Sequence, residues 1–247
     1  MVPNKVTKVA NALLREGLFE QIRMAVVSQI KAPDATCPLC GFHGKFRCFG
    51  EPVRTAVRCP SCGSLERHRL FALAHRQGAL DFKGKDILSF ASDHATRDVI
   101  LSSGPKSFDD SSYPPTPEAR LSLDIQDIDL PDGSYDVAVA SHVLEHVDDR
   151  RALSELFRIL RPGGQLIFMI PIAEGWAKTY EDPTKTSERE RHIHFGQFDH
   201  VRYYGADVRD RVKDAGFELA EFTASGPETI EYGLMRGEKV FIATKKR

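Results

Sequence analysis

The stretch SYDVAVASHVLEHVDDRRALSELFRILRPGGQLIFMIP, from Ser134 to Pro171, contains two apolar runs separated by an amphipathic segment. The runs YDVAVA (135–140) and QLIFMIP (165–171) are typical of buried strands. Between them, an aspartate at 148 or 149 can cap a helix that Pro162-Gly163-Gly164 ends. Apolar residues recur there at helical spacing: Leu153, Leu156, Phe157 and Leu160. A strand, a helix and a second strand in this order predict two parallel strands of an α/β sheet.

The same alternation extends to both sides of this stretch. It predicts a helix from Ser92 or Asp93 to Gly104, a helix over 205–215, and further strands over 86–90, 106–109, 121–125, 217–222 and 239–245. No helix is expected between the last two strands, which favours an antiparallel pair. The expected fold is therefore α/β, with a Rossmann-like, mostly parallel sheet whose last strand is antiparallel.

All five cysteines lie in one short region, and four of them form two C-x-x-C pairs, Cys37-Pro-Leu-Cys40 and Cys59-Pro-Ser-Cys62. The prolines preset a turn in each pair, and Gly41 and Gly63 directly after the pairs permit close backbone approach. Two facing turns of this kind place four thiolates in a tetrahedron, which suits Zn²⁺; iron and disulfides are the alternatives. Because four thiolates leave no coordination position open, we expect a structural zinc ribbon, with Cys48 as a small buried residue.

The expected organisation is an N-terminal helical segment (1–36), the zinc ribbon (37–63), a connecting helix (64–80) and the sheet domain (81–247). Residues 1–80 carry 12 Lys and Arg against 5 Asp and Glu, whereas residues 81–247 carry 22 against 30. This asymmetry indicates either a polyanionic partner for the front part or two differently charged surfaces that pack together. No apolar run approaches the ~20 residues of a membrane span, and residues 1–31 lack the apolar stretch of a signal peptide. We therefore expect a cytoplasmic protein without membrane contact.

Acidic residues follow several of the predicted strands. Ligands of such sheets bind beyond the carboxyl ends of the strands. That rule selects residues 89–93, Asp109/Asp110, Asp124/Ile125, Ser141/His142 and the loop after Pro171. Carboxylates at successive strand ends can accept hydrogen bonds from ribose hydroxyls and from an adenine amino group. The pattern predicts a site for an adenosine-containing ligand.

The run LDIQDIDLPDGSYDVAVASHVLEHVDDRRALSELFRILRPGGQLIFMIP, which ends at Pro171, resembles class I S-adenosylmethionine-dependent methyltransferases of the broad type-11 group. Their pattern is an acidic strand end, LP-x-D-G-S-[FY]-D, a hydrophobic strand, a His-containing turn, and a helix ending R-x-L-[RK]-P-G-G. The resemblance implies a class I methyltransferase sheet with S-adenosyl-L-methionine as cofactor. It also implies roles for six residues: Asp109 or Asp110 at the ribose, Asp124 and Ile125 at the adenine, and Ser141 and His142 near the methionine end.

The first strand–helix turn departs from the Gly-rich G-x-G-x-G pattern of that family. It reads Ser89-Phe90-Ala91-Ser92-Asp93-His94, and its small residues partly preserve the room, so Phe90 and Ala91 are still expected at the cofactor. A degenerate turn of this kind is similar to that of a subgroup with a leading C-x-x-C-G-S-L-E-R-H-R and a trailing F-G-Q-x-D-H-V-R-x-Y-G. The chain resembles this subgroup over Cys59–Arg69 and Phe195–Gly205.

The segment 172–204 concentrates aromatic and titratable residues, and we expect the methyl acceptor to bind there. His194 or His200 is the best candidate for a general base, with Asp199 as the residue that orients a neighbour. His142 and His146 are four residues apart, as in a helical metal pair, but no third ligand is nearby in sequence. They are therefore interpreted as packing and site-lining residues.

Three functions are compatible with these patterns. The expected one is an enzyme that methylates a small-molecule or glycan-type acceptor. An alternative is an RNA methyltransferase that uses the basic zinc ribbon to hold phosphates. A further alternative is a non-catalytic, methyltransferase-like binding protein, which the glycine-free first turn motivates.

Overall fold

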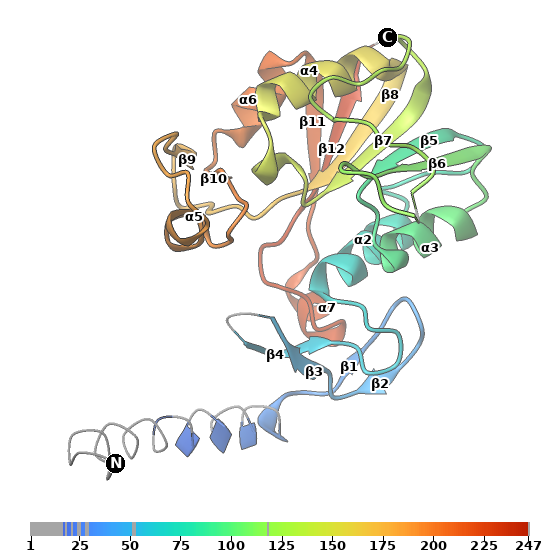
Figure 1. Cartoon of the computed structure of the whole chain (residues 1–247). Coiled ribbons are helices and arrows are strands. Elements are labelled where there is room, and N and C mark those ends of the chain that lie inside the picture. Colours follow the sequence, from blue (N-terminus) through green and yellow to red (C-terminus); the bar gives the residue numbers. More distant parts are fainter. Residues whose placement is uncertain are drawn as a thin grey trace. The chain divides into compact units, whose positions relative to one another are not determined.

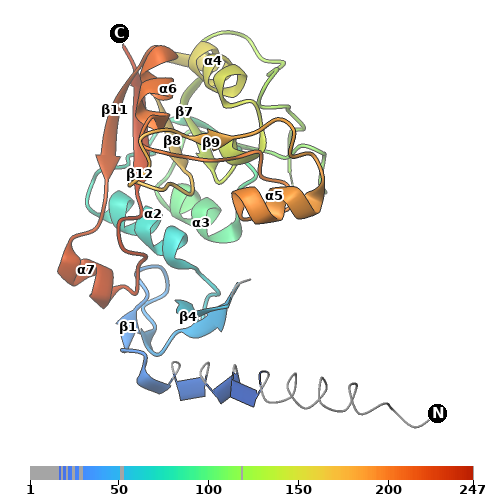
Figure 2. The same cartoon turned by 90° about the vertical axis from the view of Figure 1, so that its left-hand side faces the viewer.

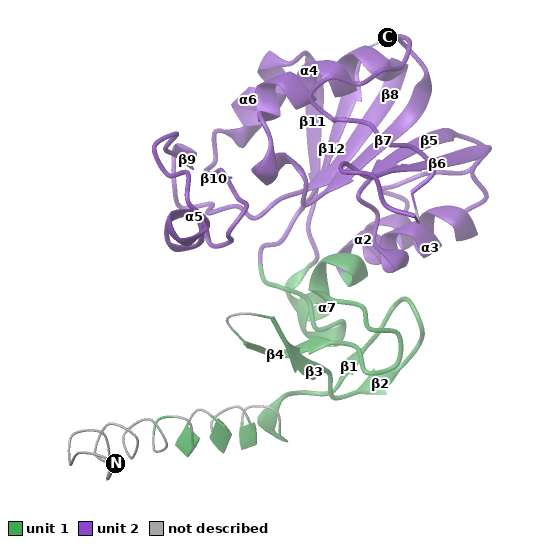
Figure 3. Ribbon diagram, in the orientation of Figure 1, with its two compact units in different colours: residues 1–69, 225–236 green, residues 70–224, 237–247 purple. Residues whose placement is uncertain are grey.

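The computed structural model describes residues 30–50, 53–117 and 119–246, together with positions 17, 19, 20, 22, 23, 26 and 27. The chain divides into two compact units (Figure 3): residues 1–69 with 225–236, and residues 70–224 with 237–247. We call them the ribbon unit and the sheet unit. Most of the expected N-terminal helical segment (1–36) lies outside the described residues. In the part of the chain that is described, no helix is both long and apolar enough to cross a bilayer.

The sheet unit is built on six strands in the order β11-β12-β8-β7-β5-β6 (Figure 1). Their bounds are β5 Asp86–Phe90, β6 Ser107–Ser111, β7 Tyr135–Ser141, β8 Leu160–Met169, β11 Phe217–Phe222 and β12 Val240–Lys245. Strands β6, β5, β7 and β8 run parallel, while β12 pairs antiparallel with both β8 and β11. The predicted mostly parallel sheet with an antiparallel last strand is confirmed.

Helices cover both faces of this sheet (Figures 1 and 2). On one face lie α4 (Asp149–Ile159) and α6 (Val208–Asp214), and on the other lies α3 (His94–Ser102). The apolar stripe of α4, including Leu153 and Leu156, is fully buried against the sheet in one core cluster. Each such side chain contributes roughly 1.5–3 kcal/mol by leaving water, which explains why the helical spacing in the sequence was so regular.

Three shorter elements follow β8, namely β9 (Tyr180–Glu181), α5 (Glu188–Phe195) and β10 (Arg202–Tyr203), and a 3₁₀ turn, η1 (Leu144–His146), precedes α4. Strands β9 and β10 pair antiparallel. Helix α5 begins with a capping box formed by Ser187 and Glu190. Elements β9, α5 and β10 lie in the segment 172–204, which was predicted to bind the methyl acceptor.

Two elements differ from the expectations. Residues 121–125 form no strand but two isolated bridges, a parallel one from Leu121 to Ser111 and an antiparallel one from Asp124 to Asp127. The chain turns at Asp124, whose side chain accepts the Gln126 amide at 2.9 Å. A short helix, α7 (Gly226–Glu231), lies between β11 and β12, so the expectation of no helix there was wrong. A capping box from Ser225 to Glu228 and a proline in the first turn start that helix.

The ribbon unit contains α7 and four short strands, β1 Ala35–Thr36, β2 His43–Gly44, β3 Arg47–Phe49 and β4 Arg54–Arg58. Arg69, in helix α2 (Glu66–Arg76), is completely buried there, and its guanidinium lies 4.3 Å from the centre of the Phe46 ring. The same group donates hydrogen bonds of 2.6–2.9 Å to four backbone carbonyls, those of Val57, Ser64, Tyr232 and Gly233. One buried cation thus joins the cysteine region to residues 225–236.

Candidate functional site

A cavity of about 320 Å³ opens at the carboxyl ends of β5 and β7 in the sheet unit. Strand β6 pairs on one side of β5 and β7 on the other, so this is the point where the strand order reverses and a crevice forms. The wall includes Phe90, Ala91 and Ser111 from the strand ends, Asp124, Ile125 and Gln126 from the loop after β6, and His142, His146 and Asp199 on the remaining side.

Two residues of the cavity wall have a backbone conformation that side chains disfavour. Ala91 has φ +50° and His142 has φ +56°, directly after β5 and β7. Each is held by a backbone hydrogen bond of 2.8 Å, from the Ala91 amide to Ser111 O and from the His142 amide to Met169 O. Strain of this kind persists where the surrounding structure enforces it, and it concentrates at binding sites.

Asp124 is fixed at the cavity by its own loop. Its Oδ1 accepts hydrogen bonds from the Gln126 backbone amide at 2.9 Å and from the Gln126 side chain at 3.2 Å. The Gln126 side-chain oxygen in turn accepts the Asp148 amide at 2.9 Å. Among the described residues, Oδ2 of Asp124 has no hydrogen-bond partner, so this oxygen can accept a bond from a ligand.

A cluster of titratable side chains lies at the opposite wall. Glu145, His146 and His200 each place one potential ligand atom within 4.8 Å of the others. The rings of His146 and His200 meet edge to face, with centroids 4.7 Å apart. Glu145 is fully buried and accepts a hydrogen bond from Nδ1 of His142 at 3.1 Å. We call Glu145, His146 and His200 the His–Glu triad.

Hydrogen bonds and ion pairs hold together the two chain segments that carry the triad, one before α4 and one before β10. Arg202 donates to the carbonyls of Leu144 and Val147 at 2.9 and 2.5 Å, and the Tyr204 hydroxyl donates to Leu144 O and to Asp149 at 3.1 Å. Further ion pairs surround them, joining Asp149 to Arg211 at 3.0 Å, and Glu181 to Arg202 and Arg211, both at 3.0 Å. Burial opposes ionisation of Glu181, but the two arginines outweigh it and lower its pKa.

Comparison with known proteins shows which of them share this architecture. Residues 107–168 match the family model described as "Methyltransferase domain". An S-adenosylmethionine-dependent methyltransferase from Mesorhizobium loti superposes with a TM-score of 0.51 at 14% identity, covering 72% of this chain and 98% of that one. A chain of the complex that contains the Haloferax volcanii Trm112 methyltransferase activator gives the same TM-score at 16% identity, covering 73% and 91%. The sheet unit therefore has the fold of these methyltransferases, and part of its sequence matches the methyltransferase family model.

Two curated sequence relatives match over shorter stretches of the chain. Malonyl-[acyl-carrier protein] O-methyltransferase of Serratia marcescens is 35% identical over 71 residues, 28% of this chain and 28% of its own length. An uncharacterised 37.1 kDa protein in a Streptomyces fradiae transposon is 39% identical over 80 residues, 32% of this chain and 23% of its own length. The chain thus spans about a quarter of the length of these curated relatives.

The sheet unit brings five of the eight predicted cofactor-binding residues to the cavity wall: Phe90, Ala91, Asp124, Ile125 and His142. The other three, Asp109, Asp110 and Ser141, lie at the ends of β6 and β7 but outside the wall. Both oxygens of Asp109 are engaged, one by the Tyr135 hydroxyl at 2.9 Å and one by Arg120 at 2.7 Å.

Asp110 points to the other side of β6 and is buried. Its Oδ2 lies 3.3 Å from Arg97, while its Oδ1 has no hydrogen-bond partner among the described residues. Burial raises the pKa of Asp110, and nearby Ser92 and Arg97 offset this only in part. Of the two aspartates considered for the ribose, Asp110 is the one with an uncommitted oxygen.

The predicted catalytic residues are placed differently from one another. Asp199 lines the cavity and lies 3.2 Å from Nδ1 of His146, while His200 is buried in the triad. Burial lowers the pKa of His200, which favours its neutral form. His194 lies on α5 and is not part of the cavity wall. Its Nδ1 forms a 2.7 Å hydrogen bond with the Tyr180 hydroxyl.

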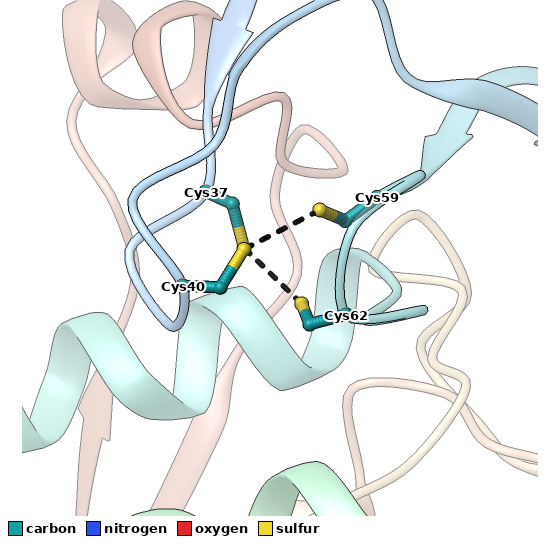
Figure 4. A group of neighbouring side chains, drawn as sticks. All are labelled: Cys37, Cys40, Cys59 and Cys62. Carbon is teal, nitrogen blue, oxygen red and sulfur yellow. Dashed lines mark hydrogen bonds between the residues drawn. The ribbon is translucent and has the colours of Figure 1, made fainter.

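The four paired cysteines of the ribbon unit face one another (Figure 4). Their sulfur atoms lie within 4.8 Å of one another, with Cys37 3.6 Å from Cys62 and Cys40 3.7 Å from Cys59. Gly41 and Gly63 both have φ +76°, so positive φ is what requires glycine there. Burial raises the pKa of Cys59 to about 12; burial acts the same way on Cys40, but hydrogen bonds from Phe42 and Ser61 outweigh it and lower that pKa to about 7.

The sequence interpretation paired His146 with His142 and missed its neighbours in space. These are Glu145 and His200, although His200 is distant in the chain. A signal was present in the trailing motif D-H-V-R-x-Y-G: Asp199 faces His146, the Val201 amide donates to Glu145 O at 3.0 Å, and Arg202 binds the flanking carbonyls. The trailing motif thus contacts the segment HVLEHV (142–147). The assumption that these two segments lie side by side would have predicted the triad.

Proposed function

We propose that the chain is an S-adenosylmethionine-dependent methyltransferase acting on a small-molecule or glycan-type acceptor. The observation that carries the proposal is the cavity at the carboxyl ends of β5 and β7, in a domain whose sequence matches the methyltransferase family. A volume of about 320 Å³ lies in the range of small-molecule sites. The cofactor supplies a methyl group activated on a sulfonium.

The residues of the cavity fit the two polar ends of this cofactor. The free Oδ2 of Asp124 can accept a hydrogen bond from the adenine amino group. The small side chain of Ala91 lets the backbone come close to the cofactor, as glycines do in the Gly-rich turn of the family. Asp110 is proposed for the ribose over Asp109, because one of its oxygens is uncommitted. His142 would border the methionine end.

The wall formed by His142, His146 and Asp199 is proposed to receive the acceptor. Rigid placement of an acceptor is worth up to about 7–11 kcal/mol of a barrier, and a neighbouring base adds about 10²–10⁴-fold. Asp199 lines this wall and is the proposed catalytic residue on this side, whereas His200 is buried outside the wall and His194, on α5, is the candidate that the geometry favours least. Residues 81–247, with 22 basic against 30 acidic residues, disfavour a polyanionic acceptor.

The cysteine cluster is proposed to hold a structural Zn²⁺. Four thiols within 4.8 Å of one another, on two matching turns, are the donor set that tetrahedral zinc prefers. The ion would require deprotonated thiols, so binding displaces protons from groups such as Cys59, whose pKa burial raises to about 12. All four positions are filled by protein ligands, and the proposed role is stability.

Calorimetry with S-adenosylmethionine and S-adenosylhomocysteine tests cofactor use. Asp124→Asn keeps an oxygen for the Gln126 amide but removes the free acceptor, so we expect about tenfold weaker binding, about 1.4 kcal/mol. Asp129→Asn, on the same loop but exposed, is the matched control and should bind normally. Absence of binding to folded wild-type protein at millimolar ligand would overturn the proposal.

Incubation with methyl-labelled cofactor and a fractionated cell extract tests the acceptor class. We expect label in the small-molecule or glycan fraction, dependent on Asp124. Label confined to RNA would contradict the proposed acceptor while leaving the methyltransferase proposal intact.

A further inference from the structure

The His–Glu triad has the composition of a metal centre. Two imidazoles and one carboxylate are a common donor set for divalent first-row transition metals, and three protein ligands leave coordination positions open. Glu145, His146 and His200 offer one ligand atom each within 4.8 Å of the others. We propose that this triad binds a divalent transition-metal ion, of the class of Zn²⁺, at the wall of the cavity.

The hydrogen bonds of the two histidines leave the same nitrogen available on each ring. His200 donates from Nδ1 to the Phe195 carbonyl at 3.1 Å, and Nδ1 of His146 lies 3.2 Å from Asp199. In both rings Nε2 is therefore the nitrogen free to bind a cation. Orientation of a ligating imidazole by a carbonyl or carboxylate on its other nitrogen is the usual arrangement around protein metals.

Glu145 provides an independent indication of a missing cation. Its side chain is fully buried, Oε1 accepts the bond from His142, and Oε2 has no hydrogen-bond partner within the described residues. A buried carboxylate oxygen without a donor is costly, and a coordinated cation removes that cost. Among the described residues, histidines surround this carboxylate, and no lysine or arginine forms an ion pair with it.

The two chain segments that supply the ligands are fixed before any ion binds. Arg202 and Tyr204 bind the carbonyls that flank Glu145 and His146, and the Val201 amide binds Glu145 O at 3.0 Å. Such preorganisation limits the entropy lost on binding and favours a specific site. His146 also lines the cavity, so an ion on the triad would have its open positions toward the cavity side.

An ion in this position would orient an oxygen of the methyl acceptor. This consequence rests on the proposed function, whereas metal binding by the triad does not. It narrows the acceptor to a compound with an oxygen ligand, such as a hydroxyl or carboxylate, near the methylated atom.

Titration of the zinc-loaded protein with Co²⁺ tests the site directly. We expect one further equivalent per chain, with visible absorption that lacks thiolate-to-cobalt bands because the triad contains no sulfur. His146→Ala and Glu145→Gln should each remove this equivalent, while His192→Ala, an exposed histidine on α5, should retain it. Circular dichroism and thermal unfolding confirm that the variants are folded.

A second readout requires no substitution. In ¹⁵N spectra of wild-type histidines, Zn²⁺ added beyond the first equivalent should shift Nε2 of His146 and His200. Uptake of no further equivalent, or uptake unchanged by both variants, would overturn the metal site. Cofactor calorimetry on the same samples separates this outcome from failure of the proposed function, because Asp124 and Ala91, which are proposed to hold the cofactor, belong to other segments of the cavity wall than the triad.

Discussion

The cysteine cluster and the His–Glu triad are two groups of potential metal ligands, one in each unit. The four cysteines come from one stretch of fewer than thirty residues and lie on two matching backbone turns. The triad takes Glu145 and His146 from the 3₁₀ turn before α4, and His200 from the segment before β10. The cysteine cluster offers four protein ligands, whereas the triad offers three, and its His146 lines a cavity.

The two clusters also differ in what keeps them assembled. Among the cysteines, local hydrogen bonds shape each turn, and the two turns meet through weak contacts of the sulfur atoms, such as Cys37 with Ser64 at 3.3 Å, which a bound ion would replace by strong bonds. Around the triad, Arg202, Tyr204 and Asp149 form a buried polar network that needs no ion. A metal is thus expected to be essential for the first cluster and optional for the fold of the second.

The largest expected effect is loss of the ribbon unit's structure in Cys37→Ser. Structural zinc contributes about 10–16 kcal/mol in small zinc domains, so the variant should lose zinc and expose its remaining thiols. Because all cysteines lie between residues 37 and 62, thiol labelling reports on this unit alone. Cys48→Ser, outside the cluster, is the control and should keep both zinc and protection. Stoichiometric zinc in folded Cys37→Ser would show that the contrast between the clusters is wrong.

Features that depend on residues close together in the sequence could be predicted, and features that depend on distant residues could not. The cysteine turns, the alternation of strands and helices, and helix α4 were predictable because spacing over a few residues determines them. Five of the eight residues predicted to bind the cofactor line the cavity because strand ends converge in any parallel sheet. The triad and the ion pairs of Arg202 were not predicted, since they depend on how the segment after β8 folds back onto η1.

The next largest effect is expected for Asp149→Ala. Asp149 is buried with Arg211 at 3.0 Å and the Tyr204 hydroxyl at 3.1 Å, and its removal leaves buried donors unpaired. The sheet unit should lose about 3–5 kcal/mol of unfolding free energy. Trp176, the only tryptophan, lies in this unit, and its fluorescence in a urea titration measures the loss.

The neighbouring residue supplies the control. Asp148 caps α4 by accepting the amides of Arg150 and Arg151, and Asp148→Ala should cost only about 1 kcal/mol. Equal losses for the two variants would mean that the network adds nothing beyond helix capping, and that the triad lacks its proposed preformed support.

A smaller loss of stability is expected when either of two glycines, Gly205 in the sheet unit or Gly41 beside the cysteine cluster, is replaced by alanine. A Cβ at Gly205 would lie 2.5 Å from the Lys178 backbone and 2.8 Å from Trp176 O, so Gly205→Ala should cost about 1–3 kcal/mol through steric overlap. At Gly41 a Cβ meets nothing within 4 Å, and only φ +76° is unfavourable, which costs roughly 1–2 kcal/mol. Trp176 fluorescence reports the first loss and thiol protection the second. A reversed order would show that the segment after β8 is looser than its contacts indicate.

The smallest effect concerns two alanines with positive φ, Ala91 at the cavity (+50°) and Ala56 in β4 of the ribbon unit (+58°). Changing either to glycine relieves roughly 1–2 kcal/mol of strain but adds about 0.5–1 kcal/mol of backbone entropy to the unfolded state. Both variants should therefore be stabilised by about 1 kcal/mol or less in the unit concerned. Cofactor calorimetry then separates the sites: Ala91→Gly should bind at least as tightly as wild type, because the cavity gains room, and Ala56→Gly should not change binding. Weaker binding by Ala91→Gly would mean that the strained alanine itself holds the β5 turn in its binding form.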